Sequence, residues 1–173
     1  TRPSHGVWLG AQRRREPRLV CMSDLPARLG TRPKTSASGL HRQLSQHSPP
    51  QIWGRMVAAI FSLPKVIEGH SSVSAPGSRA VLLKDLTDAR SAESSLAPVS
   101  ERLEPAHVHG VFDTSLHVCL PAGRGHEICA LGWGEPHRYA DHATEFMLYG
   151  PRDREEITVI LDIVRESIAF ARA

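Results

Sequence analysis

Aromatic side chains are scarce in this chain of 173 residues, at 5% of the total. Proteins that bind single-stranded nucleic acid commonly stack its bases on aromatic rings. The basic residues of this chain are scattered rather than gathered in one stripe, and few aromatic residues lie among them. Nucleic acid is therefore not an expected partner.

Cysteine is also rare, with only Cys21, Cys119 and Cys129 in the whole sequence. An odd number of cysteines without a Cys-x-x-Cys spacing indicates neither a disulfide framework nor a zinc ribbon. Proteins that lack disulfides are typical of reducing compartments. The composition therefore predicts a cytoplasmic location.

Long apolar runs are absent, since no stretch approaches the roughly 20 residues that a membrane-spanning helix needs. The first residues also lack the apolar core of a secretory signal. We therefore expect a soluble protein without a membrane partner. The chain opens on Thr1, and Met22, which follows the arginine cluster of residues 13–15, is a candidate translational start.

Charge divides the sequence into two parts. Residues 1–55 hold ten basic and two acidic side chains, whereas residues 56–173 hold eleven basic and sixteen acidic ones. The first 50 residues are rich in Arg, Ser, Pro, Gln and His and show no sustained apolar period, so they cannot bury enough surface to offset the entropy lost on ordering. We predict an extended or disordered basic arm over residues 1–50 and a single domain over residues 51–173.

Two amphipathic helices bracket the predicted domain. Apolar residues recur at helical spacing over residues 51–63, and Pro64 ends the pattern. Near the C-terminus, Asp153 and Glu156 have the spacing of a capping box ahead of an apolar stripe over residues 157–171. The second helix is expected to pack on a sheet.

Short strands separated by turn residues fill the space between these helices. The expected strands cover residues 66–74, 80–83, 107–109, 115–120 and 146–149, with a short helix over residues 127–131 and Gly132 just after it. The polar stretch from Lys84 to Glu104 is expected to be a loop. The pattern predicts the α+β class, with a small antiparallel sheet packed by an N-terminal and a C-terminal amphipathic helix.

Histidines mark the centre of the predicted sheet. His107 and His109 lie two residues apart on one strand, so both imidazoles project from the same face. His117 lies on the partner strand, and His137 follows Glu135 in a glycine-rich turn. If they converge, these groups can hold zinc, iron, manganese or copper, although the spacing is not specific. We favour the simpler alternative, in which the four imidazoles are half-exposed and hydrogen-bonded to neighbouring carbonyl or acidic groups.

Other side chains allow different chemistry. Glu135 can orient His137 for acid and base work. Ser115 shares a strand face with His117 but lacks the sequence of a nucleophile elbow. Cys119 is a second candidate nucleophile, although packing as a small apolar residue is the interpretation that we favour.

Two further residues are candidates for ligand binding. Trp133, flanked by glycines, can form a stacking wall for a ligand, or it can fill the core, which we favour. Arg152 next to a helix N-terminus suits an anion, but a turn followed by a helix cap explains the same residues and is the preferred interpretation.

The histidines belong to a larger set of residues that resembles the small bacterial and fungal family called the luciferase domain family. The matching runs are Ala106 to His109, Asp113 to Val118, Leu120-Pro121, Gly132 to His137 and Tyr149 to Asp153, with Ser167 and Phe170-Ala171. Upstream, the segment that precedes the domain in actinobacterial members resembles Arg28 to Gly30, Arg32-Pro33, His41, Gln43-Leu44, Gln46 and Pro49-Pro50. The resemblance spans about residues 25–172.

The chain departs from the family pattern at Pro105, where phenylalanine is frequent, at Gly110, where proline is frequent, and over residues 84–102. The family name implies light-producing oxidation, whereas the sequence carries no flavin or adenylate motif. The resemblance therefore implies a fold more directly than a reaction.

The sequence is compatible with three functions. We expect a small-ligand-binding module with a polar pocket lined by the candidate residues His107, His109, His117, Trp133, Glu135, His137 and Arg152. The alternative is an oxidoreductase or hydrolase that uses a transition metal on the same histidines, with Glu135 as general base. The second alternative is a structural or partner-binding protein that docks through its basic arm.

Overall fold

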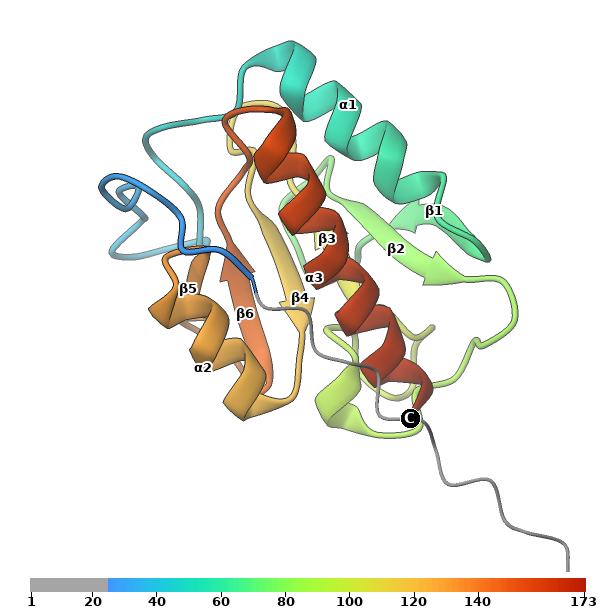
Figure 1. Ribbon diagram of the computed structural model, residues 1–173. Coiled ribbons are helices and arrows are strands. Elements are labelled where there is room, and N and C mark those ends of the chain that lie inside the picture. Colours follow the sequence, from blue (N-terminus) through green and yellow to red (C-terminus); the bar gives the residue numbers. More distant parts are fainter. Residues whose placement is uncertain (1–24) are drawn as a thin grey trace, which may run out of the picture.

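A computed structural model describes residues 25–173 (Figure 1). This part of the chain forms one six-stranded antiparallel sheet and three α-helices, which confirms the predicted α+β class. The helices are α1 (Pro50–Phe61), α2 (Ala122–Ala130) and α3 (Arg154–Arg172). The strands are β1 (Val66–His70), β2 (Arg79–Leu83), β3 (Ala106–Val108), β4 (Leu116–Cys119), β5 (Gly134–Pro136) and β6 (Glu145–Leu148). Their order across the sheet is β1-β2-β3-β4-β6-β5.

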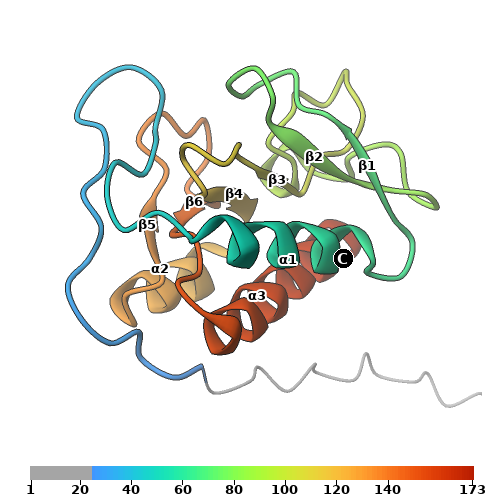
Figure 2. The same ribbon diagram turned by 90° about the horizontal axis from the view of Figure 1, so that it is seen from above.

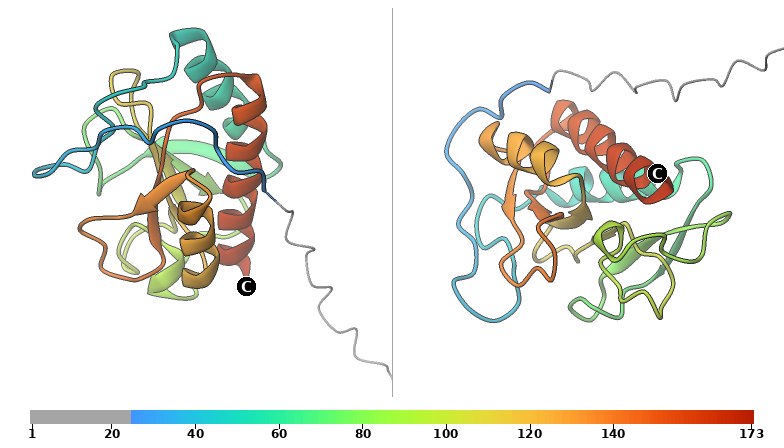
Figure 3. Two further views of the ribbon diagram at one scale, coloured as in Figure 1. Left: turned by 60° about the vertical axis from the view of Figure 1, so that its left-hand side comes forward. Right: turned by 90° about the horizontal axis from the view of Figure 1, so that it is seen from below.

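The three helices cover one face of the sheet, and the long loops gather on the other (Figure 2, Figure 3). Helices α1 and α3 pack against each other and against the sheet, as the amphipathic patterns predict. The core between them includes Met56, Ile60, Val81, Leu116, Val118, Phe146, Leu148, Ile160 and Val164. Within residues 25–173, no helix combines the length and the apolar character that crossing a membrane requires.

Local chemistry explains where two of the helices begin. The Asp153 side chain accepts a hydrogen bond from the Glu156 backbone N–H at 2.8 Å, which caps α3 as predicted. Helix α2 starts at Ala122, earlier than the sequence predicts, because the glycines in its first turns weaken the helical signal. Gly125 is nevertheless required there, since a Cβ atom would lie 2.0 Å from Cε2 of Phe146.

Strand β5 is absent from the sequence prediction, which treats its residues as a turn. It is three residues long, ends in Pro136 and lies at the edge of the sheet, where proline is tolerated. It pairs with β6 so closely that a Cβ atom on Gly134 would lie 2.1 Å from the Met147 carbonyl oxygen. This strand brings Glu135 into the sheet.

One row of paired residues crosses the sheet on the face away from the helices. His107 of β3 lies between Ala80 of β2 and His117 of β4, His117 pairs with Met147 of β6, and Met147 pairs with Glu135 of β5. Paired residues project to the same face of a sheet. The strand register therefore lines up the candidate site on the loop-covered face.

The N-terminal segment, residues 25–49, contains no helix or strand and packs along the domain (Figure 1). Arg28 donates hydrogen bonds to the Glu156 carboxylate and to the Gly150 carbonyl, each at 2.9 Å from Nη2. His41 and Gln43 are buried. We therefore propose that the folded unit begins near Leu25 rather than at residue 51. The predicted arm before that point, with Met22 and Cys21, lies outside the described residues.

The anchor of this segment predicts a dependence of stability on pH. Burial alone would raise the pKa of Glu156, but hydrogen bonds from Arg28 and Arg152 outweigh it and lower the pKa from 4.5 to about 2. The ion pair therefore stabilises the fold above the unfolded-state pKa, and this contribution disappears as the pH falls from 4.5 towards 2. Glu156→Gln is expected to lose about 2 kcal/mol of unfolding free energy near neutral pH and less near pH 3.

Urea unfolding of both proteins at the two pH values measures this effect. Glu155→Gln is the matched control, because Glu155 is the neighbouring residue and is exposed. A constant difference between wild type and Glu156→Gln at both pH values would contradict the assignment.

Candidate functional site

The hairpin of β3 and β4 brings three histidines together on the loop-covered face. His107 and His117 are directly opposite each other, and the ring centroids are 4.9 Å apart. The ring of His109, two residues after His107, lies 4.5 Å from that of His117. All three side chains line a single pocket, together with His137.

This pocket has a volume of about 400 Å³. It is bounded by the N-terminal segment, the β1–β2 loop, the segment before β3 and the loop after β5. Apolar side chains form much of its wall, and they include Leu40, Val73, Ala75, Leu96, Ala97 and Val99. The imidazoles form a polar floor under these apolar walls.

The histidines of the hairpin are buried rather than half-exposed. His107 is 2% exposed, His109 3% and His117 6%. The simpler interpretation of the sequence therefore underestimates their burial. Buried imidazoles need hydrogen-bond partners, and carboxylates supply two of them.

Glu104 and Asp113 hold the outer nitrogens of two histidines. The Nδ1 atom of His107 lies 2.7 Å from Glu104 Oε1, and the Nδ1 atom of His109 lies 2.6 Å from Asp113 Oδ2. A carboxylate only accepts hydrogen bonds, so each Nδ1 carries a proton and donates it. In the neutral form of each ring, the Nε2 atom then presents a lone pair.

Asp113 connects the histidines to the N-terminal segment. Its Oδ1 atom accepts hydrogen bonds from the Gln43 backbone N–H at 3.0 Å and from the Ser115 hydroxyl at 2.6 Å. The adjacent Thr114 is fully buried with φ at 66°, a conformation that is strained for a β-branched residue. These contacts fix the β3–β4 loop.

His117 is the central imidazole. Its Nδ1 atom lies 3.0 Å from His107 Nε2, and because His107 carries its proton on Nδ1, His117 is the donor. Its Nε2 atom is buried and has no hydrogen-bond partner among the described residues. Burial lowers the pKa of His117 well below its usual range, and the surrounding imidazoles lower it further. His117 is therefore neutral near pH 7, with an unshared lone pair on Nε2.

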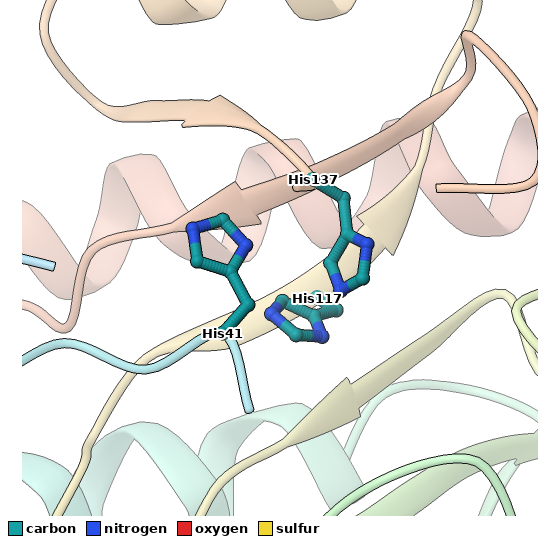
Figure 4. A group of neighbouring side chains, drawn as sticks. All are labelled: His41, His117 and His137. Carbon is teal, nitrogen blue, oxygen red and sulfur yellow. The ribbon is translucent and has the colours of Figure 1, made fainter. Parts of the chain in front are cut away.

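His41 is a functional candidate that the site prediction misses. It comes from the N-terminal segment and lies beside His117 and His137 (Figure 4). Its Nε2 atom is 2.7 Å from Glu135 Oε1, and the Tyr149 hydroxyl donates to the other oxygen of that carboxylate at 2.9 Å. The sequence did hold a signal, since His41 is among the residues that carry the family resemblance.

His137 completes the group from the loop after β5. Its ring centroid lies 4.3 Å from that of His117 and 5.2 Å from that of His41. Burial and the neighbouring imidazoles lower its pKa to about 4. His137 is therefore also neutral near pH 7.

Besides Glu135, which contacts the pocket only through His41, two candidate residues lie outside the pocket lining. Trp133 is 3% exposed and donates from Nε1 to the Pro26 carbonyl at 2.7 Å, so it packs in the core beneath the N-terminal segment. Arg152 pairs with Glu156 at the start of α3 and donates to the Leu29 carbonyl. The structure gives both residues contacts that anchor the N-terminal segment.

The candidate nucleophiles have other partners. The Ser115 hydroxyl donates to Asp113, and burial raises the pKa of Cys119 well above its usual range. A thiol with a raised pKa is a poor nucleophile near neutral pH. Imidazoles and carboxylates therefore dominate the chemistry of the pocket.

The fold and the pocket together define a small α+β domain with a cluster of histidines in its pocket. The family model of the luciferase domain matches residues 102–167, which confirms the resemblance to this family seen in the sequence. The matched region includes both strands of the histidine hairpin and His137, while His41 precedes it.

Curated relatives extend this similarity upstream. The chain is 28% identical to a luciferase of Armillaria gallica over 86% of its own length and 62% of the relative's length. It is 29% identical to a luciferase of Neonothopanus nambi, with 86% and 61% of the two chains covered. The chain thus spans about three fifths of these relatives. They are fungal and do not support an actinobacterial origin, and no solved structure matches the chain significantly.

Proposed function

We propose that the domain binds a small organic molecule in the histidine pocket. The volume of about 400 Å³ supports this proposal, because small-molecule sites usually measure roughly 300–1,000 Å³. Apolar walls above a few convergent polar groups are also typical of such sites. The ligand class that suits this pocket has an apolar body and a hydroxyl group that can donate a hydrogen bond.

The observation that carries the proposal is the buried Nε2 atom of His117. A buried acceptor without a partner costs roughly 1–3 kcal/mol of stability. A ligand that supplies a partner at this end of the pocket recovers that free energy on binding. The hydroxyl group of the ligand is therefore directed towards the imidazole floor.

The row of Glu104, His107 and His117 also supports acid and base chemistry. It holds His117 with its proton on Nδ1 and its lone pair on Nε2. If a ligand hydroxyl gives its proton to Nε2, the proton on Nδ1 can move to His107, where the Glu104 carboxylate stabilises the positive charge. The step leaves an oxyanion on the ligand, a neutral His117 and a positive charge on His107 that is paired with Glu104.

The names of the relatives agree with a small organic ligand. A luciferase oxidises such a molecule with emission of light, and four curated fungal luciferases match this chain. The chain spans only part of those proteins, so their light-producing oxidation does not carry over to it directly. Whether this chain performs that reaction has to be tested. Docking through a basic arm is a weaker candidate, because residues 25–49 contribute His41 to the pocket.

Ligand binding is tested with two fluorescent probes that differ only in whether they carry an O–H group. The metal-free protein is titrated with 2-naphthol and with 2-methoxynaphthalene, which has the same ring system without the O–H group. We expect 2-naphthol to bind about tenfold more tightly, which corresponds to about 1.4 kcal/mol for one buried hydrogen bond. Equal affinities, or no binding of either probe, would refute a pocket that selects a hydroxyl ligand through its imidazoles.

A further inference from the structure

Three imidazoles surround one point at the floor of the pocket (Figure 4). They belong to His41 of the N-terminal segment, His117 of β4 and His137 of the loop after β5. One nitrogen from each ring can be chosen so that all three lie within 4.8 Å of one another. Two ligands of one metal ion need to be about 3–4 Å apart, so small side-chain shifts bring the three nitrogens into range.

The hydrogen bonds determine which nitrogens face this point. The outer nitrogen of His41 is Nε2, which contacts Glu135, and the outer nitrogen of His117 is Nδ1, which contacts His107. Among residues 25–173, His117 Nε2 has no hydrogen-bond partner, and His41 Nδ1 accepts a long hydrogen bond, 3.3 Å, from the Arg138 backbone N–H. His117 Nε2 is therefore available as a ligand, and His41 Nδ1 becomes available when it gives up this one weak hydrogen bond.

His137 follows the same pattern more loosely. Its Nδ1 atom accepts a hydrogen bond from the Tyr139 backbone N–H at 3.3 Å and lies 3.9 Å from Glu145 Oε2, so metal binding through Nε2 requires the tautomer in which Nδ1 donates to this carboxylate instead. Its Nε2 atom is left to face His117 and His41 (Figure 4). Histidines that bind metals almost always have the second ring nitrogen held by a carboxylate, a carbonyl or another polar group.

A second triad, His107, His109 and His117, is less suitable. His107 Nε2 is already taken by His117 at 3.0 Å, and the rings of His107 and His109 stack at 23° rather than converge. Its role is to support the first triad, because His107 connects His117 to the Glu104 carboxylate. The metal site therefore differs from the one expected from the sequence: His117 and His137 remain ligands, His107 and His109 do not, and His41 is added.

We propose that His41, His117 and His137 bind one divalent transition metal ion, with a further coordination position open to the pocket. Three imidazoles with an open position are a ligand set used for catalytic zinc, and imidazole also suits cobalt, iron, nickel and copper. Glu135 and Glu104 act as outer carboxylates that orient His41 and, through His107, His117. A bound ion occupies the His117 Nε2 lone pair, so in the metal-bound protein the ligand hydroxyl meets the open coordination position instead of Nε2; only this last statement rests on the proposed function.

Cobalt is the probe for the site, because Co²⁺ bound to imidazoles has visible absorption. Tag-free protein is stripped with a chelator and titrated with Co²⁺, followed by competition with Zn²⁺. We expect one equivalent to bind, and we expect His41→Ala and His137→Gln each to weaken binding by more than about 100-fold, since even outer-shell substitutions cost about 10–100-fold. Glu135→Gln is expected to weaken Co²⁺ binding by about 10–100-fold, the range typical of outer-shell substitutions.

His142→Gln is the matched control, because His142 lines the same pocket but is not one of the three ligands. Its Co²⁺ affinity is expected to equal that of wild type, and thermal unfolding of every variant verifies the fold. Absence of stoichiometric Co²⁺ binding, or equal binding by His41→Ala, His137→Gln and wild type, overturns the metal site. Binding of 2-naphthol without Co²⁺ binding would remove this inference and leave the proposed function, whereas Co²⁺ binding without 2-naphthol binding would do the reverse.

Discussion

Asp113→Ala is expected to lose about 3–5 kcal/mol of unfolding free energy, a large fraction of the roughly 5–15 kcal/mol that stabilises a typical domain. The carboxylate is buried and accepts hydrogen bonds from Gln43, from Ser115 and from His109. Removing it leaves the Gln43 backbone N–H without its acceptor in a buried site and the His109 Nδ1–H with only the Ser115 hydroxyl oxygen at 3.0 Å. The N-terminal segment and the β3–β4 loop then lose a shared attachment.

Urea unfolding at neutral pH measures this loss. Asp88→Ala is the control, because Asp88 is exposed on a loop and its removal is expected to change the unfolding free energy by less than about 0.5 kcal/mol. Asp113→Asn keeps the shape of the side chain but has one acceptor oxygen fewer, so it is expected to fall between Asp113→Ala and wild type. A loss below about 1 kcal/mol for Asp113→Ala would show that Asp113 does not connect these parts of the fold.

Local patterns in the sequence account for most of the fold. The cap at Asp153, the helical period before Pro64 and the alternation around His107 each act over a few residues, and each predicts an element that the structure contains. Strand β5 was not predicted because it is three residues long and contains both glycine and proline, which disfavour strands. Its pairing with β6 stabilises it, and pairing partners are not visible in a local pattern.

The candidate site depends more strongly than the fold on contacts between residues that are far apart in the sequence. A period of two places His107 and His109 on one face, so their shared orientation follows from the sequence. His41 meets Glu135 across 94 residues, and no local period relates them. Glu104 stands at the end of a polar stretch, and only the fold shows that it is 2% exposed and paired with His107.

His117→Phe is expected to weaken 2-naphthol binding by about 10–100-fold in the metal-free protein. Phenylalanine keeps a flat ring at this position but removes the Nε2 lone pair and the Nδ1–H that donates to His107. The apolar walls and the other imidazoles of the pocket are unchanged, so the apolar part of the probe is bound as before. The affinity for 2-methoxynaphthalene is therefore expected to stay nearly unchanged.

His126→Gln is the control for this substitution. His126 is exposed on α2, where its ring lies edge-on to Phe146, and it does not line the histidine pocket. Its replacement is expected to leave both probe affinities at the wild-type value. Thermal unfolding of His117→Phe separates a loss of binding from a loss of fold.

The central claim is that the imidazole floor of the pocket, with His117 at its centre, receives the hydroxyl group of a ligand. The fluorescence of bound 2-naphthol tests it most directly, because the excited naphthol emits as naphtholate when a proton acceptor touches its O–H group. The account predicts naphtholate emission from the complex with metal-free wild type and its loss in the complex with His117→Phe. The same naphtholate emission and the same affinity in both proteins would contradict it.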